Sequence, residues 1–251
     1  MGTILNIIMI LVGGALGLAF GSRLPERVRE TVLGGLGLFT IAIGLQMTTQ
    51  SQNMLIVLVS LLVGGVLGEW INIEAALKRL GAWLEKRFAS EASGVSGVSG
   101  EGSSGGKFIK GFVTASLIFN IGPMAILGSI RDGLSGDIQL LAIKSVLDGF
   151  AALAFAALLG VGVMFSALTV GVYQGIITLL AAQAQAVLTE PMIAEMTATG
   201  GVLIMGIGVS SLLELKPIRV GNFLPALAIA PMVVAALPFG QQLWARLMSL
   251  L

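Results

Sequence analysis

Asp148 and Lys144 are charged residues inside Ile138–Phe165, an apolar stretch long enough to cross a bilayer. A charge at bilayer depth costs at least about 2.5–3.5 kcal/mol on insertion scales, so it normally faces a cavity or a partner. With a rise of about 1.5 Å per residue, Asp148 lies about 16 Å in from Asp137, near the midplane. The spacing of the two residues places them on one helix face, where they can pair. Such a pair is either a structural ion pair or part of a transport or gating site, and we favour the second interpretation.

A second polar position lies in the apolar segment Phe108–Ser129, where Asn120 stands beside Gly122 and Pro123. Proline breaks the helical hydrogen-bond ladder, so this segment is either a kinked span or a re-entrant hairpin. Carbonyl and N–H groups freed by such a break can coordinate ions when they line a cavity. Ser116 shares a helix face with Asn120. The alternative is a kink that only fits neighbouring helices.

Other polar side chains interrupt the remaining apolar runs. Each one alone is more often a hydrogen bond between helices than a ligand, but together they could complete a polar cavity around Asp148. Glu195, at the entry to its segment, is expected to be shallow enough to be solvated. The predicted substrate- or ion-binding residues are Asp148, Lys144, Asn120, Ser116, Ser145, Gln174 and Asn222, with Gly122 and Pro123 as the structural break.

Composition places this chain among polytopic membrane proteins. Of its 251 residues, 56% are hydrophobic and only 11% charged, and its 35 glycines suit close packing of transmembrane helices. The absence of Cys and His excludes thiol redox chemistry and the usual zinc and haem ligands, so we expect neither a metal nor a cofactor. A net charge of +1 gives no reason to expect nucleic acid. No nucleotide-binding loop or protease motif occurs, so an enzyme is not expected.

Apolar runs of the length that a bilayer requires predict about eight spans. Basic residues cluster after the first, third and seventh of them, and the positive-inside rule then puts both termini outside, with all eight segments crossing. The apolar start is interpreted as a retained first span rather than a signal peptide. The predicted spans are Thr3–Gly21, Thr31–Thr48, Asn53–Trp70, Phe108–Ser129, Ile138–Phe165, Thr169–Leu188, Ile193–Leu213 and Ile218–Leu237.

One long loop departs from this pattern. Apolar residues recur at helical spacing over Ile73–Phe88 with charges on the other faces, which predicts an amphipathic helix on the cytoplasmic surface or a short helix packed on the spans. A flexible Gly/Ser linker follows at 91–107. We therefore divide the chain into an N-terminal three-span unit with this helix (1–90), the linker, and a C-terminal five-span unit (108–251).

Two glycine-containing segments match without gaps. Gly37–Gly44 in the second span can be aligned with Gly201–Gly208 in the seventh, and the predicted topology runs these spans in opposite directions. Spans 1–3 and 6–8 would then form an inverted repeat around spans 4 and 5, as in many secondary transporters. The alternative is a chance match between glycine- and isoleucine-rich segments.

Longer motifs resemble a known family. The run Gly111–Asp137 resembles the DUF554 (YdfK/YqgA-like) family of bacterial membrane proteins, and so do Lys144-Ser145-Val-Leu-Asp148-Gly149, Glu195–Gly201 and Arg219–Ala226. The similarity covers nearly the whole chain except the linker. It implies a multi-pass protein of the bacterial plasma (inner) membrane, in a family often guessed to be transporters, and it supplies no established binding residues.

The expected fold is an all-α polytopic transmembrane helix bundle with a broken fourth span. The predicted function is a transporter or channel for a small ion or small polar solute, centred on Asp148 and Lys144. The alternative is a structural or regulatory membrane protein that acts through a partner protein or lipid and transports nothing. Besides membrane lipid, a homo-oligomer is a candidate partner, because the glycines from Gly13 to Gly21 suit close helix contacts between or within subunits.

Overall fold

The computed structural model describes residues 1–21, 25–89 and 104–248, without the side chains of 29, 88–89, 104–105 and 238–248. Within this part of the chain, seven helices are long and apolar enough to cross a membrane, and a bent helix pair supplies an eighth span. The prediction of an all-α polytopic bundle of about eight spans is confirmed. Most of the predicted linker lies outside the described residues.

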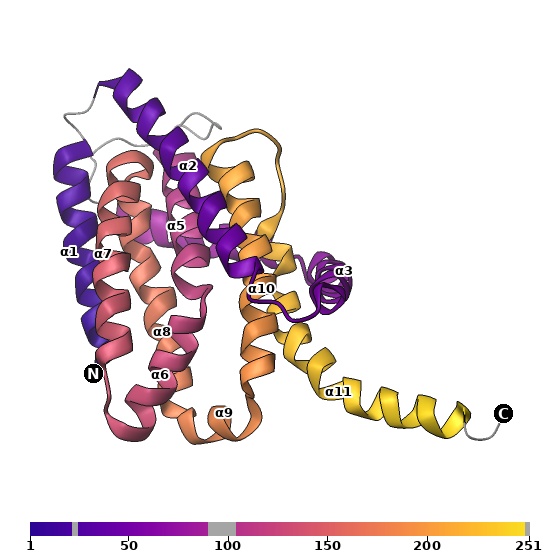
Figure 1. Cartoon of the computed structure of the whole chain (residues 1–251). Coiled ribbons are helices and arrows are strands. Elements are labelled where there is room, and N and C mark those ends of the chain that lie inside the picture. The colour runs from indigo at the N-terminus through magenta and orange to yellow at the C-terminus, as the bar shows by residue number, and fades with distance from the viewer. Residues whose placement is uncertain (22–24, 90–103, 249–251) are drawn as a thin grey trace.

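The helices carry the labels of Figure 1, and short 3-10 or π turns are labelled η. They are α1 (Gly2–Gly21), α2 (Glu26–Thr48), α3 (Met54–Ile71), α4 (Ile73–Leu84), η1 (Glu85–Ala89), α5 (Ser104–Asn120), α6 (Pro123–Ser135), α7 (Gln139–Leu159), η2 (Val161–Phe165), α8 (Ser166–Leu179), α9 (Ala181–Val187), α10 (Glu190–Ile207), η3 (Gly208–Leu212), η4 (Val220–Phe223) and α11 (Pro225–Met248).

Two predicted spans have wrong bounds. The predicted span Thr169–Leu188 is Val161–Leu179 in the structure, and the separate short helix α9 follows it. The apolar run Ile138–Phe165 is divided at Gly160, which has φ +84°, a conformation that residues with a Cβ rarely adopt. Helix α7 therefore ends at Leu159, and Val161–Phe165 forms the 3-10 turn that begins the next span. Hydrophobicity alone did not show this division because both sides of Gly160 are apolar.

Helices α1 and α7 run parallel in direct backbone contact. A Cβ atom on Gly13 would lie 2.0 Å from the Gly149 carbonyl oxygen, and one on Gly17 would lie 2.2 Å from that of Leu153. A Cβ on Gly21 would lie 2.4 Å from the Ala157 oxygen. The glycine stripe of α1 is therefore used inside one subunit, against α7. A homo-oligomer stays a prediction, without support from this stripe.

The other two N-terminal spans also pack on the C-terminal half, α2 on α10 and α3 on α11. Helices α2 and α10 pack antiparallel. A Cβ atom on Gly44 would lie 2.5 Å from the Gly201 carbonyl oxygen, and one on Gly201 would lie 2.4 Å from the Gly44 carbonyl oxygen. A Cβ on Gly208 would lie 3.0 Å from the Gly37 carbonyl oxygen. These are the reciprocal contacts that a two-fold axis between the aligned segments requires. The inverted repeat itself stays a prediction, and so does the division into 1–90 and 108–251.

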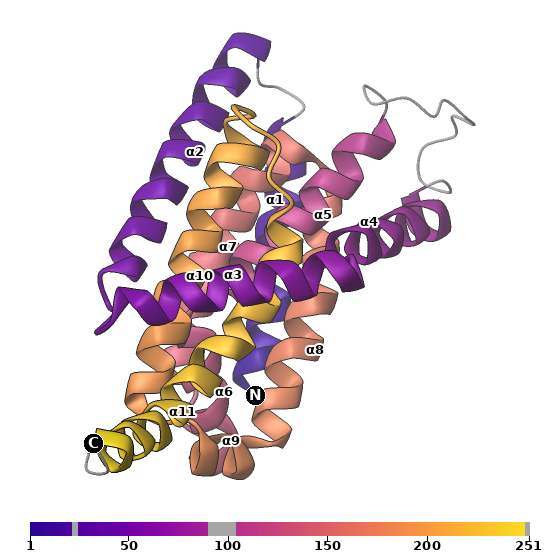
Figure 2. The ribbon, with the colours of Figure 1, turned by 90° about the vertical axis from the view of Figure 1, so that its right-hand side faces the viewer.

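Helices α3 and α4 follow one another across the flank of the upright helices, as Figure 2 shows. Asn72 joins them in a left-handed conformation, φ 56°. Helix α4 buries Leu84 against Phe108 and Phe112 of α5, while Trp83 is 58% exposed. The predicted amphipathic helix thus exists, and it is packed on a span along part of its apolar face.

The broken fourth span passes along the whole of α7. Its first half, α5, begins beside the end of α7, where Gly111 lies next to Leu159. Its second half, α6, ends beside the start of α7, where Gly128 packs on Leu141. Figure 1 shows α5 and α6 following one another from one end of the bundle to the other. The segment is a kinked span rather than a hairpin that returns to its own side.

Candidate functional site

Lys144 and Asp148 form an ion pair on one face of α7. The Lys144 ammonium bonds the Asp148 Oδ2 atom, and the two side chains are 8% and 11% exposed. The same ammonium donates a second hydrogen bond, 2.8 Å long, to the main-chain carbonyl of Phe119 in α5. The pair that the sequence spacing predicted is therefore present, nearly sealed from solvent, and it bonds directly to the end of the broken helix.

Pro123 explains why the Phe119 carbonyl is available. In an unbroken α-helix, that carbonyl would accept a hydrogen bond from the N–H of residue 123, but proline has no N–H. Gly122 takes φ +150°, and the axes of α5 and α6 meet at 64°. Lys144 thus supplies the donor that the proline removes. The break and the ion pair are two parts of one arrangement.

Asn6 on α1 is a third partner, which was not among the predicted site residues. Its Nδ2 donates a 2.9 Å hydrogen bond to the Asp148 Oδ2 atom, and the residue is fully buried. The parallel contact between α1 and α7 sets the register that brings it there. In the sequence, Asn6 is an amide within the apolar run Thr3–Gly21, which marks it as a buried polar residue. The sequence does not show that this run packs against α7.

Asn120 is the last residue of α5, directly before the break. Its Nδ2 donates to the Ser116 carbonyl (2.8 Å) and to the Thr169 hydroxyl of α8 (3.2 Å). Among the described residues, neither Asn120 Oδ1 nor Ser116 Oγ has a hydrogen-bond partner, although both atoms are buried. Ser145, also buried, donates to the Leu141 carbonyl within its own helix at 2.6 Å. The end of α5 therefore carries two buried oxygen atoms without a hydrogen-bond partner among the described residues.

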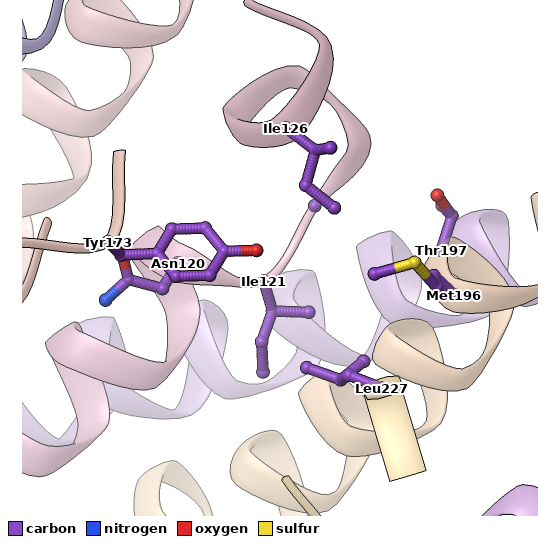
Figure 3. Close-up of a pocket in the computed structure, with 8 residues that line it drawn as sticks. Asn120, Ile121, Ile126, Tyr173, Met196, Thr197 and Leu227 are labelled. Atoms are coloured by element: carbon purple, nitrogen blue, oxygen red, sulfur yellow. The ribbon is translucent and has the colours of Figure 1, made fainter. Parts of the chain in front are cut away.

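A small pocket opens on the break. The cavity has a volume of about 10 Å³, roughly room for one water molecule. Figure 3 shows the Tyr173 hydroxyl directed into it, with Met196 and Thr197 of α10 on the opposite side. Asn120, Ile121, Gly122, Ile126 and Leu227 complete the lining.

Two of the predicted residues, Gln174 and Asn222, make no hydrogen bond to this site within the described part of the chain. Gln174 on α8 is fully buried, and both its amide atoms lack a partner among the described residues. Asn222 lies at the junction of α3 and α4 instead. It donates to Glu69 (2.6 Å) and accepts from the Glu74 N–H (2.8 Å), while Arg219 pairs with Glu69. Asn222 therefore ties η4 to the junction of α3 and α4 on the flank of the bundle.

Glu195 is also structural, and the expectation that it is solvated is wrong. It is 1% exposed and accepts hydrogen bonds from the Ser51 hydroxyl (2.8 Å) and from the N–H groups of Gln52 (2.8 Å) and Asn53 (3.0 Å). A carboxylate is stabilised at a helix N-terminus by the free N–H groups there. Glu195 thus fixes the α2–α3 turn to α10.

Apolar helices of spanning length around a buried polar centre define a multi-pass membrane protein. The chain belongs to the family described as "Protein of unknown function (DUF554)", whose model matches residues 1–235. It is 31% identical over 237 residues to the "Uncharacterized membrane protein YdfK" of Bacillus subtilis (strain 168), covering 93% of this chain and 95% of the relative. It is 29% identical over 235 residues to the "Uncharacterized protein YqgA" of Escherichia coli (strain K12), covering 94% and 96%. No solved structure matches the chain.

The resemblance read from the motifs is confirmed, and with it the placement of the chain as a multi-pass bacterial membrane protein.

Proposed function

We propose that this protein is a transporter or channel for a small ion or small polar solute, with Asp148 as its central binding carboxylate. The observation that carries the proposal is the buried Lys144–Asp148 pair, bonded to a main-chain carbonyl at a helix break. Charged groups are rare inside membrane segments and mark ion or substrate pathways by default. Broken helices provide coordinating carbonyls in many secondary transporters.

A small cation is the solute that this geometry suits best. The Lys144 ammonium is a tethered cation held by a carboxylate oxygen and a carbonyl oxygen. Small hard cations prefer the same oxygen ligands, and the unpaired Asn120 and Ser116 oxygens lie on the same helix as that carbonyl. A cation that displaced the ammonium, or a proton taken up by Asp148, would give the site two states. Exchange between them is the proposed coupling step.

Flux in proteoliposomes tests the proposal. The purified protein would be reconstituted and uptake of Na⁺, K⁺, Rb⁺ and H⁺ followed under imposed gradients. We expect Asp148→Asn to abolish the flux, because the amide keeps the size of the side chain but carries no charge for a cation or a proton to neutralise. Flux of Asp148→Asn at the wild-type rate for every ion carried would remove the proposal.

A double variant separates transport from folding. Removing one partner of a buried ion pair commonly costs about 3–5 kcal/mol, whereas removing both is often neutral. Lys144→Met/Asp148→Asn should therefore recover thermal stability relative to Lys144→Met alone, while flux stays absent. If the double variant recovered both, the pair would be structural.

The second candidate function is a regulatory or structural membrane protein that acts through α4. The observation that favours it is the exposed part of the α4 apolar face, with Trp83 58% and Leu80 39% exposed beside the basic residues of this helix. Trp83→Gln would then weaken membrane or partner binding while Asp148→Asn would act only through stability. If the protein is a transporter, Asp148→Asn should abolish flux, whereas Trp83→Gln should change it little.

A further inference from the structure

Several buried polar atoms in the described chain have no protein hydrogen-bond partner, and most of them come from three helices, α1, α6 and α8. The largest group is Gln174 on α8, whose side chain is 0% exposed and whose Nε2 and Oε1 atoms are both unpartnered. The other atoms on these helices are Thr3 Oγ1, Asn6 Oδ1, Ser129 Oγ and Thr178 Oγ1. We call these five residues the polar strip.

Contacts on either side of Gln174 show which helices it faces. One turn earlier in α8, a Cβ on Gly171 would lie 3.0 Å from Ile7 Cδ1 of α1. One turn later, a Cβ on Gly133 of α6 would lie 2.2 Å from the Thr178 carbonyl oxygen. Residues three and four apart share a helix face, so Gln174 lies between the contact with α1 and the contact with α6.

Helices α1 and α6 bring their own polar atoms to this level. Leu141 of α7 packs against Gly2 of α1 and against Gly128 of α6, which places these two glycines at one depth. The next residue in each helix is a member of the polar strip, Thr3 in α1 and Ser129 in α6.

The two ends of the strip are also defined. Asn6, one turn deeper than Thr3, donates to Asp148 and keeps its Oδ1 free of protein partners within the described chain. At the other end, Asp132 of α6 accepts hydrogen bonds from the Gly2 N–H and from the Met1 amino group, both 2.9 Å long. Figure 1 shows this end of the bundle, where the α6–α7 turn and the N-terminal residue lie.

A buried amide or hydroxyl without a hydrogen-bond partner destabilises the fold, so five such residues together are hard to reconcile with a dry interior. Ordered waters normally satisfy groups of this kind, each with about three hydrogen bonds. We infer that the polar strip holds a chain of internal water that connects the α6–α7 end of the bundle to Asp148. Its role as an entry path rests on the proposed transport function, but its existence is testable without any flux.

The natural chain has no cysteine, so single cysteines report on this path without background. Gln174→Cys, Ser129→Cys and Thr178→Cys would be treated with a membrane-impermeant methanethiosulfonate trimethylammonium reagent in right-side-out and inside-out vesicles. The thiolate is the reactive form, and it requires water. We expect all three to react from the face that labels Ser135→Cys in the exposed α6–α7 region, with Gln174→Cys the slowest because it lies deepest.

Val172→Cys and Ile176→Cys are the matched controls. They flank Gln174 on the same helix and at the same depth, but their native side chains are 56% and 52% exposed on the outside of the bundle, where lipid suppresses the thiolate. Gln174→Cys should react at least about tenfold faster than either control, since thiolate formation sets the rate. Ser129→Cys and Thr178→Cys differ little in size from the native side chains, so they decide the test if Gln174→Cys does not fold.

Labelling no faster than the controls, or only from the opposite face, would overturn the water path. Failure of the transport proposal has a different signature: the cysteines would react as expected, while Asp148→Asn left every measured flux unchanged.

Discussion

At the scale of single residues, the site depends on one missing N–H group. Pro123 leaves the Phe119 carbonyl without its helical donor, and Lys144 occupies the vacant position from another helix. The lysine is therefore held by a main-chain dipole as well as by Asp148. An ion pair with only a locking role would not need a broken helix beside it, which is why we consider the two features together.

Pro123→Ala tests this dependence. Alanine restores an N–H that can bond the Phe119 carbonyl, and proline at the first position of α6 costs that helix little, so thermal stability should stay nearly equal. Lys144 loses an acceptor, and we expect flux to fall by about tenfold or more, the equivalent of about 1.4 kcal/mol in barrier height. Flux and a melting curve of the same preparation would check both statements.

Pro225→Ala is the control for this experiment. Pro225 stands at the first position of α11, where a missing N–H leaves no helical carbonyl unpaired. Its replacement should leave flux unchanged. Unchanged flux in Pro123→Ala as well would show that the break does not support the site.

Part of this site could be predicted from the sequence. The Lys144–Asp148 pair follows from helical spacing within α7, and the break follows from proline chemistry. The partners that cross between helices did not follow, because Asn6 and the Phe119 carbonyl reach the pair only through the packing of α1 and α5 on α7. Asn222 was predicted to line the cavity because its neighbours in sequence are apolar. Those neighbours do not show which helices it meets, and in the structure it binds Glu69 and Glu74 at the α3–α4 junction.

At the scale of elements, glycine decides which helices touch. Three glycines at intervals of one turn let the α1 backbone rest on the α7 backbone, and this contact places Asn6 against Asp148. The motif was visible in the sequence, but its partner was not, since a glycine stripe fits a helix of the same chain and one of a second copy equally well. The same holds for α2 and α10: their glycines align in sequence, but the alignment does not show that the two helices touch.

Gly17→Ala should separate α1 from α7. The added methyl group would lie 2.2 Å from the Leu153 carbonyl oxygen, a backbone atom that cannot turn away, so the helices must move apart. We expect a loss of about 1–3 kcal/mol, as for other overpacked interiors, measured by thermal or denaturant unfolding in detergent.

Gly175→Ala provides the comparison. No atom lies within 4 Å of a Cβ at this position of α8, and alanine is the better helix former by about 1 kcal/mol. Stability should be equal or higher. If both substitutions had the same effect, the α1–α7 contact would not be the reason for the glycine at position 17.

At the scale of the whole molecule, the first three spans do not form a group of their own. Each has its principal partner in the second half of the chain: α7 for α1, α10 for α2 and α11 for α3. The composition change at 91–107 predicted a division in sequence, and sequence order gives no information on which helices pack across it.

Co-expression of residues 1–96 and 97–251 as separate chains tests whether the two halves depend on each other. Because the glycine contacts join them along their length, the fragments should copurify with an affinity tag on either one, and the N-terminal fragment expressed alone should be degraded or aggregate. An N-terminal fragment that is monodisperse and helical by itself would support two independent units.

The contact between α1 and α7 also limits how the protein could change shape. Backbone resting on backbone leaves no side chains to repack, so these two helices can neither slide nor rotate against each other without steric overlap. Any rocking motion that exposed Asp148 to alternate sides of the membrane would have to carry α1 and α7 as one rigid body. The hinge would then lie in the broken span that packs along α7, where Gly122 divides α5 from α6.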